Sequence, residues 1–407
     1  MICLFIFSCV ILYYITLIII FKVKSKFWYI QPCYHFYDLH YVFYKNQVIQ
    51  RDLPKINSFV SFEKVNTYSP DDIHEKSFNH IVELLRNEYY HTKNASYNPT
   101  IQSILPYLSK NFHNSYISLA IKPTYTPSSD NNNIIKYNDI IGCIMSKSIC
   151  ITTYSHEFYS YYVDFFCIKR EYRKLGYSEI MIQSHEYSNR IKTKEIQTHL
   201  FKREGVLTGI VPVVTYNTHL YNLPDIINHY STPSNFLYNI KDTINTPSPI
   251  LIQITKSNAY LLVDYLKSIK EMNCFPFVAT SNISNIIELI ETKNIFCFVL
   301  FYRQDIYASY FLKNTYMEIE AKQCLSCFAS IKDKSYDTYI TEYTFYQTFL
   351  QILHIMGKFS FLFIENISHN HLLIKEIGDC ISTSKTAYFL YNYIFQPVKP
   401  KEVFIFI

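Results

Sequence analysis

Residues 163–180 read VDFFCIKREYRKLGYSEI, a stretch in which three patterns follow one another. The apolar run from Val163 to Ile168 is typical of a buried strand, and the segment from Gly176 to Ile191 carries apolar side chains at helical spacing. The turn between them is basic, and a helix that begins after such a turn offers backbone amides beside positive charge. The stretch therefore predicts a strand, an anion-binding turn and a helix. The alternative is an ordinary solvated turn, because so short a pattern often arises by chance.

The C-terminal segment AYFLYNYIFQPVKPKEVFIFI, which begins at Ala387, keeps a strand-like apolar pattern to its last residue. Termini usually fray and are polar, whereas Val403 to Ile407 is typical of a strand that is buried on both faces. This pattern predicts that the α-carboxylate of Ile407 lies inside the protein, where a charge is unfavourable unless it is paired or used. Such a carboxylate can accept a proton from an amine. The alternative is a strand that only completes a sheet.

The overall composition excludes several classes of protein. A chain of 407 residues has room for two domains or one bilobal unit, and its 49% hydrophobic content excludes disorder. A net charge of +5 predicts no nucleic-acid partner but suits an anionic, phosphate-bearing cofactor. The closest cysteine pair, Cys324 and Cys327, lacks the further ligands of a zinc site, so we expect no metal and reduced, buried thiols.

Residues 2–21, ICLFIFSCVILYYITLIIIF, contain no charged side chain and match the length of a membrane-spanning helix. Lys22, Lys24 and Lys26 follow at once, and positive flanks stay in the cytosol. The sequence therefore predicts a membrane anchor over residues 1–22, with the body of the protein in the cytosol. A cleaved signal peptide is the alternative, although it usually carries its positive charges before the apolar core.

Hydrophobic periodicity predicts further elements along the chain. A polar stretch at 123–133 separates two of the expected strands and predicts a loop. The expected helices cover 70–90, 101–108, 257–272 and 342–356, and the expected strands cover 115–122, 139–146, 295–302 and 359–364.

Four islands of sequence resemble motifs of one enzyme family and occur in the same order. KFWYIQP at 26–32 is similar to FWxTQPV, and VDFFCI at 163–168 is similar to NFLCVH. RKLGYS at 173–178 resembles RSKRLA, while IGD at 377–379 and YFLYNY at 388–393 resemble GDG and YYLYNWK. The chain thus resembles the eukaryotic-type glycylpeptide N-myristoyltransferases over nearly everything after residue 25. Abundant Tyr, Phe, Ile, Lys and Asn are typical of an AT-rich genome.

The resemblance implies an α+β fold of two fused GNAT-like acyltransferase halves, related by a pseudo-two-fold axis and sharing a saddle-shaped sheet. Strand, basic turn and helix at 163–191 are the signature of such a half. Residues 23–225 would form the half that binds the acyl-CoA, and residues 226–407 the half that holds most of the peptide groove.

The resemblance also implies the reaction: transfer of a myristoyl group from myristoyl-CoA, the co-substrate, to the N-terminal glycine of proteins. The backbone amides of Phe165 and Phe166 would bind the developing oxyanion, and the carboxylate of Ile407 would take the proton of the glycine ammonium. Peptide-groove positions would be Tyr302, Phe345, Tyr346, Gly378 and Asp379. The CoA site would comprise Lys26, Phe27, Trp28, Phe166, Cys167, Ile168, Arg173, Lys174, Leu175, Gly176, Tyr177 and Ser178.

Several residues depart from the family pattern. Asp164 and Phe166 stand where the family has Asn and Leu, residues 202–205 read KREG in place of YTAG, and residues 378–380 read GDC in place of GDG. The cofactor half is therefore better preserved than the peptide half. Two alternatives stay open: a pseudoenzyme that binds acyl-CoA or peptides without turnover, and a GNAT-type acyltransferase with another acceptor, which would not need Ile407.

Overall fold

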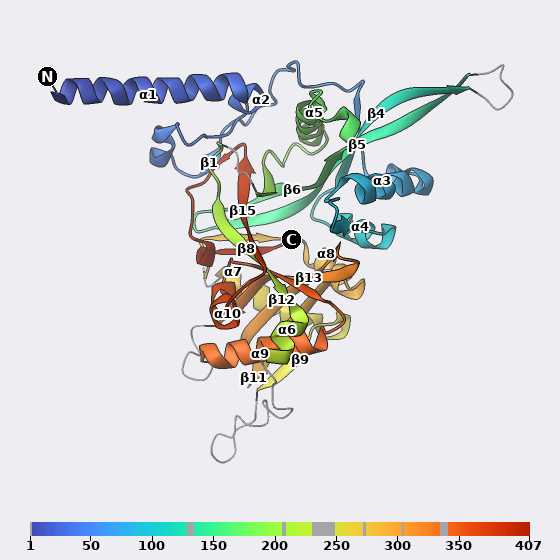
Figure 1. Cartoon of the computed structure of the whole chain (residues 1–407), viewed down its shortest axis with the longest axis vertical. Coiled ribbons are helices and arrows are strands. Elements are labelled where there is room, and N and C mark those ends of the chain that lie inside the picture. Colours follow the sequence, from blue (N-terminus) through green and yellow to red (C-terminus); the bar gives the residue numbers. More distant parts are fainter. Residues whose placement is uncertain are drawn as a thin grey trace, which may run out of the picture.

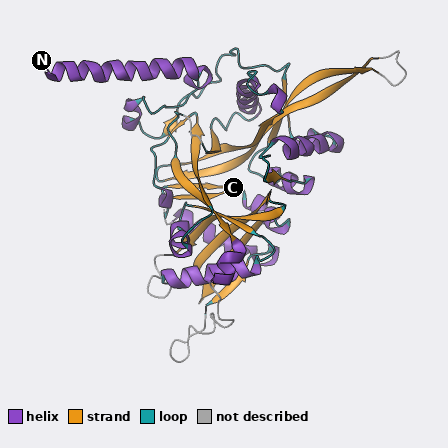
Figure 2. Ribbon diagram, viewed as in Figure 1, coloured by secondary structure: helices purple, strands orange, loops and turns teal. Residues whose placement is uncertain are grey.

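The structure is a computed structural model that describes residues 2–127, 134–205, 209–229, 249–271, 274–302, 305–333 and 341–407. One large sheet runs through the middle of the body, and the helices lie around it (Figures 1 and 2). Within the described residues this sheet has 15 strands, ordered β17-β10-β5-β6-β7-β15-β8-β14-β13-β12-β11-β9, with β2, β3 and β4 attached at its sides.

The strands of this sheet are β2 (Val65–Tyr68), β3 (Ala95–Tyr97), β4 (Tyr116–Pro127), β5 (Ile134–Thr153), β6 (Glu157–Ile168), β7 (His199–Glu204), β8 (Val214–Asn222), β9 (Ile250–Gln253), β10 (Phe277–Thr280), β11 (Ile295–Tyr302), β12 (Asp305–Ile319), β13 (Lys322–Lys332), β14 (Phe361–Glu365), β15 (Ser382–Tyr391) and β17 (Val403–Phe406). The short strands β1 (Gln47–Val48) and β16 (Tyr393–Ile394) pair separately.

The α-helices are α1 (Ile2–Lys24), α2 (Lys26–Tyr29), α3 (Glu75–Glu88), α4 (Ile101–Leu108), α5 (Tyr177–Lys192), α6 (Leu223–His229), α7 (Ala259–Glu271), α8 (Ile283–Glu291), α9 (Glu342–Ile355) and α10 (Asn370–Ile377). Short 3-10 helices include η1 (Leu39–Phe43), η2 (Pro70–Asp72), η3 (Arg170–Tyr172), η5 (Lys256–Asn258) and η7 (Pro400–Glu402).

Strands from distant parts of the chain alternate in the sheet. β15 lies between β7 and β8, and β10 and β17 extend the sheet beyond β5. β8 in turn pairs with β14. The two predicted halves therefore share one sheet, and the C-terminus lies near the centre of the molecule (Figure 1).

The elements expected from periodicity are present, with shifted ends. Local capping explains some shifts: Pro70–Asp72 forms a separate 3-10 turn before α3, and residues 256–258 form another before α7. The expected last residue of the helix at 257–272, Met272, lies outside the described residues. Gly176 has a φ of 82° and precedes α5, so the turn that the sequence predicted here uses a conformation that favours glycine.

The prediction of a loop over 123–133 is wrong for residues 123–127. Residues 123–127 continue β4 and pair with 134–138 of β5, so the hairpin is longer than the polar composition suggested. The reason is that Thr and Tyr at 124–126 favour strands once a partner strand is present. Residues 128–133 lie outside the described part of the chain.

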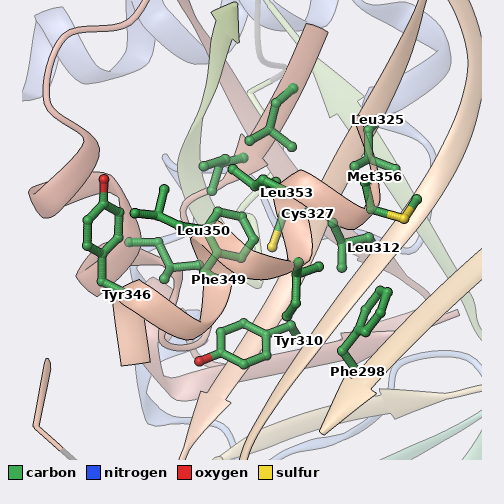
Figure 3. Packing of buried hydrophobic residues seen from close by; sticks show 14 of the residues in the cluster. Phe298, Tyr310, Leu312, Leu325, Cys327, Tyr346, Phe349, Leu350, Leu353 and Met356 are labelled. Carbon is green, nitrogen blue, oxygen red and sulfur yellow. The ribbon is translucent and has the colours of Figure 1, made fainter. Parts of the chain in front are cut away.

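The core of the C-terminal half lies between α9 and the strands β11 to β14. Figure 3 shows Phe349 and Leu353 of α9 close to Leu312, Leu325 and Cys327 of the sheet. These side chains are fully buried. Strands with near-continuous burial and a helix that is buried over most of its length thus form the core layer of this half.

Truncating Phe349 should destabilise this layer. We expect Phe349→Ala to lower the free energy of unfolding by about 3–5 kcal/mol, because it removes a fully buried aromatic ring. Ile355→Ala, on the same helix at a side chain that is 58% exposed, should change it by no more than about 0.5 kcal/mol. Urea denaturation of the detergent-solubilised full chain measures both variants, and equal effects would contradict this account of the core.

Candidate active site

A cavity of about 400 Å³ lies beside the large sheet. It is lined by β6, β7, β12, β14 and β15, by residues around α3 and α4, and by the end of the last strand. The acidic and basic side chains among its described lining residues are Asp164, Lys202, Glu204, Lys313 and Glu365.

The last strand brings Ile407 to this cavity. β17 pairs in parallel with β10, and the amide of Ser281 donates a hydrogen bond of 2.9 Å to the carbonyl of Phe406. Phe404 and Phe406 are fully buried, and both rings pack against Phe311. Ile407 itself is partly exposed and lines the cavity. The predicted buried strand is present, and its end faces a space large enough for reacting groups.

β6 contains an irregularity beside the cavity. In its pairing with β5, Cys167 is opposite Cys143 and Asp164 is opposite Met145, so two residues of β6 face one residue of β5. Phe165 has a φ of 53°. Such a bulge takes its residues out of the regular ladder. Phe165 and Phe166, whose amides the resemblance assigns to the oxyanion, have no ladder partner on β5 or β7.

The side chain of Asp164 accepts a hydrogen bond from one of these amides. Its Oδ1 accepts a hydrogen bond of 2.8 Å from the Phe165 N–H and one of 3.1 Å from the Tyr89 hydroxyl. Burial, together with the Asp164 charge, raises the pKa of Tyr89 well above its usual value. The hydroxyl therefore stays a neutral donor at neutral pH. A carboxylate is thus held at an amide that the resemblance assigns to the oxyanion.

An ion network crosses the cavity. Glu365 is 2% exposed, and its Oε1 lies 3.0 Å from Lys202 Nζ and 3.8 Å from Lys313 Nζ. Its Oε2 accepts a hydrogen bond of 2.6 Å from the Tyr216 hydroxyl. Lys202 also lies 3.4 Å from Glu204. Burial alone would raise the pKa of Glu365, but the two lysines lower it overall, so the carboxylate stays charged.

In the KREG stretch, which stands where the family has YTAG, every second side chain faces the cavity and belongs to this network. Lys202 and Glu204 line the cavity, whereas Arg203 does not, as expected when successive side chains of a strand point to opposite faces. The sequence alone placed these charges near the site but gave no sign that Lys202 would be matched by Glu365.

The basic turn before α5 is only partly free to bind an anion. Lys174 and Gly176 both adopt positive φ, and α5 begins directly afterwards. The Arg173 guanidinium, however, donates to Glu88 Oε2 at 2.8 Å and to the carbonyl of Ile168 at 2.8 Å. The backbone thus has the form expected of a phosphate-binding turn, while one of its two predicted cations already has a carboxylate partner. Leu175 is 64% exposed.

The other predicted CoA residues lie next to strands of the sheet. The Phe27 ring is buried against Trp28 and Phe59, and Trp28 stacks on Phe201 of β7 at 6.1 Å between ring centroids. Lys26 is exposed. Cys167 and Ile168 are buried at the end of β6, and Tyr177 and Ser178 begin α5 and are partly exposed. The first sequence island therefore lies against β7, which pairs with β6, the strand that carries the second island.

The predicted peptide-groove residues do not gather at the cavity. Phe345 and Tyr346 lie in the core of the C-terminal half, with 0% and 3% exposure. Gly378 has a φ of 83° after α10, and Asp379 is exposed beside it. Tyr302 ends β11, and its side chain lies outside the described set. Phe345, Tyr346, Gly378 and Asp379, the four whose side-chain surroundings the structure describes, do not line the cavity.

The sequence reasoning missed other residues at or near the cavity. Glu365 closes the apolar run FSFLFIE, and a charge at the end of a buried strand was the available signal. Lys313 and Tyr107 carried no comparable signal. Tyr107 is partly exposed, lines the cavity and has the Lys147 ammonium 4.1 Å above its ring. Burial lowers the pKa of Lys147 to about 7.

No protein-family model matches the chain, and no curated protein matches its sequence. Its structure is similar to N-myristoyltransferase of Saccharomyces cerevisiae with bound myristoyl-CoA, with a TM-score of 0.66 at 12% identity, covering 92% of this chain and 94% of that one. A second structure of the yeast enzyme with myristoyl-CoA and inhibitors gives a TM-score of 0.64 at 13% identity and covers 96% of both chains.

At this level of identity the likeness shows the fold. The match extends over nearly the whole chain and agrees with the α+β architecture. This chain therefore has the N-myristoyltransferase fold that its motifs predicted.

Proposed function

We propose that the chain is an acyltransferase that moves a myristoyl group from myristoyl-CoA to the amine of an N-terminal glycine on peptides or proteins. The observation that carries this proposal is the meeting of Ile407 with the bulge at Phe165 in one cavity. Acyl transfer to an amine needs an oxyanion site and a proton acceptor on opposite sides of a reacting carbonyl. The fold of N-myristoyltransferase supports the same choice.

The proposed chemistry is direct attack. The amine nitrogen forms a bond to the thioester carbonyl carbon, whose oxygen becomes an oxyanion held by the bulge amides of Phe165 and Phe166. The α-carboxylate of Ile407 takes one proton of the substrate ammonium, which gives the nitrogen the free lone pair for this attack. Collapse of the tetrahedral intermediate then breaks the carbon–sulfur bond, and the departing sulfur takes the second N–H proton, so that CoA leaves as the thiol. The products are an amide and CoA.

The charge of the cavity favours a cationic acceptor. Three carboxylates, from Asp164, Glu204 and Glu365, line it against two ammonium groups, from Lys202 and Lys313. The α-carboxylate of Ile407 would add a further negative charge. A cleft with an excess of one sign raises the local concentration of ligands of the opposite sign, so an ammonium-bearing peptide end suits this lining.

The proposal includes attachment to a membrane. Phe5–Val23 has a mean hydropathy of 2.4 and is not buried by the rest of the molecule, so its length and composition fit a bilayer-crossing helix. Lys22 lies at its end, and Lys24 and Lys26 follow it, which predicts a cytosolic body. Anchoring suits the reaction, because acyl chains and acylated products partition into membranes. A signal sequence is the alternative that the same helix allows.

A second candidate function is an acyl-CoA-binding protein without turnover. The observation that favours it is the hydrogen bond from the Phe165 amide to Asp164, which places a negative charge where the oxyanion would form. A third is acyl transfer to another amine, for which Ile407 would not be needed.

Transfer itself is the first prediction. The full chain in detergent, mixed with myristoyl-CoA and peptides that begin with Gly, should release CoA and add a myristoyl group to the peptide, as measured by thiol detection and mass spectrometry. Matched peptides that begin with Ala should not gain mass, because the added methyl group crowds the attacking nitrogen. Tight binding of myristoyl-CoA without transfer would contradict the proposed activity and favour an acyl-CoA-binding protein without turnover.

The role of Ile407 gives a second prediction. Adding a Gly-Gly pair after Ile407 moves the carboxylate away, and we expect kcat to fall about 10²–10⁴-fold, the usual contribution of a positioned proton acceptor. Myristoyl-CoA binding should be unchanged. Ile407→Val keeps the carboxylate and is the matched control. Full activity of the extended chain would contradict this role and favour an acceptor that needs no terminal carboxylate.

Asp164 gives a third prediction. Asp164→Asn removes the charge that faces the developing oxyanion, and we expect kcat to rise at least about tenfold, since unit charges about 4 Å apart repel by about 4 kcal/mol near a protein surface. Glu204→Gln removes an equal charge from the cavity but leaves the Phe165 amide untouched. A slower Asp164→Asn enzyme would show that this carboxylate assists the reaction.

A further inference from the structure

A segment that follows the first helices exposes an unusual amount of apolar surface. Residues 34–44, YHFYDLHYVFY, are called the aromatic arm here. Phe43 is 89% exposed, and Phe36, Val42 and Tyr44 are 54%, 57% and 45% exposed. Isolated exposed apolar side chains are ordinary, but a cluster of this kind marks a surface that binds something.

The aromatic arm packs against α1. The Phe21 ring of α1 lies against the rings of His35 and Tyr37, with centroids 4.6 and 5.4 Å away. The Tyr14 hydroxyl, two turns earlier on the helix, donates a hydrogen bond to the carbonyl of Tyr37. Two separate turns of α1 thus contact the arm, so the arm and the helix have a defined relative position.

Gly209 strengthens this attachment. A Cβ at this position would lie 2.7 Å from the Phe21 ring and 2.9 Å from the Phe36 ring, so only glycine lets α1 and the arm approach the body so closely. The amide of Phe36 donates a hydrogen bond of 3.0 Å to the carbonyl of Gly209. The arm is therefore held on both sides, by the anchor helix and by the body.

The contact with Tyr14 sets the depth of the arm. Tyr14 lies nine residues before Val23, where the apolar stretch ends, which corresponds to about 13 Å along a helix. The hydrocarbon core of a bilayer is about 30 Å thick. If α1 occupies that core, a segment that touches Tyr14 must enter the membrane from the same side as the body.

The polar groups of the arm are suited to such a place, because several find partners inside the protein. Asp38 Oδ2 accepts a hydrogen bond of 2.8 Å from the amide of His35 and lies 3.4 Å from its Nδ1. The amides of Tyr41 and Tyr44 donate to carbonyls three residues earlier, and the carbonyl of Tyr41 also accepts from Gln396 Nε2 at 2.9 Å. Internal pairing of this kind is what lipid surroundings require.

We propose that the aromatic arm is a second membrane-contact surface, which inserts Phe36, Val42, Phe43 and Tyr44 into the bilayer from the side of the body. This inference rests on the anchoring of α1 in the proposed function. The contact with Tyr14, about halfway along the apolar stretch, would bring the arm below the headgroups and into the hydrocarbon. The exposed Lys26 and Lys45 flank the arm and match anionic headgroups. The partner is thus a lipid bilayer, and the body is held against it by two attachments.

Depth-dependent quenching tests the proposal with the full chain in nanodiscs of phosphatidylcholine and phosphatidylserine, with or without acyl-brominated lipid. Phe43→Trp reports on the arm and Val10→Trp on α1. Ile355→Trp is the matched control, since Ile355 is 58% exposed at the end of α9, on the side of the molecule away from α1 (Figure 1). The native Trp28 contributes equally to all three and is subtracted with the wild-type chain.

We expect brominated lipid to quench the added emission of Phe43→Trp as strongly as that of Val10→Trp and several-fold more than that of Ile355→Trp. Quenching of Val10→Trp without Phe43→Trp would overturn the arm as a membrane surface while leaving the α1 anchor intact. Loss of both signals would overturn the anchor as well. An unquenched Phe43→Trp in a chain that sediments as a dimer would assign the arm to a protein contact.

Discussion

The parallel pairing of β17 with β10 is the constraint on which the site depends. Alternate residues of β17 enter different cores: Phe404 and Phe406 pack with the C-terminal half, while Val403 and Ile405 pack with residues of β5 and β15. A slip of this strand by one residue would exchange the two sets and place the bulky Phe rings in the core that fits Val403 and Ile405. The register that satisfies this packing also fixes Ile407 at the rim of the cavity.

Charged side chains line the wall of the cavity that contains the bulge at Phe165. The bulge at Phe165 releases amides from the ladder, but this chain places a carboxylate next to them, and Lys202 and Glu365 add a buried ion pair farther along. Buried pairs of this kind seldom add much net stability, because desolvation offsets their attraction. Their retention at a cavity is better understood as a way to shape the electric field that an incoming amine and acyl group would meet.

Local pattern was sufficient for the strand at 163–168, the helix that follows Gly176, and the buried C-terminal strand, because hydrophobic period and glycine placement specify them within a few residues. It was insufficient wherever partners are far apart in sequence. Neither the pairing of Lys202 with Glu365 nor that of Arg173 with Glu88 has a local signal. Phe345 shows the same limit, since an aromatic side chain on a helix reads identically whether it faces a groove or a core.

Close packing joins α1 and the residues that follow it to the body of the protein. A single helix on a flexible linker would hold the protein near a bilayer without fixing its orientation. Here Phe21 packs on Gly209, and Trp28, a few residues later, stacks on Phe201 of β7, the strand that also carries Lys202 to the cavity. α1 is therefore coupled to the cavity wall through close packing rather than through a tether. If α1 spans a bilayer as proposed, a second contact at the aromatic arm would also restrain rotation about the helix axis, and the cavity would keep one orientation to that bilayer.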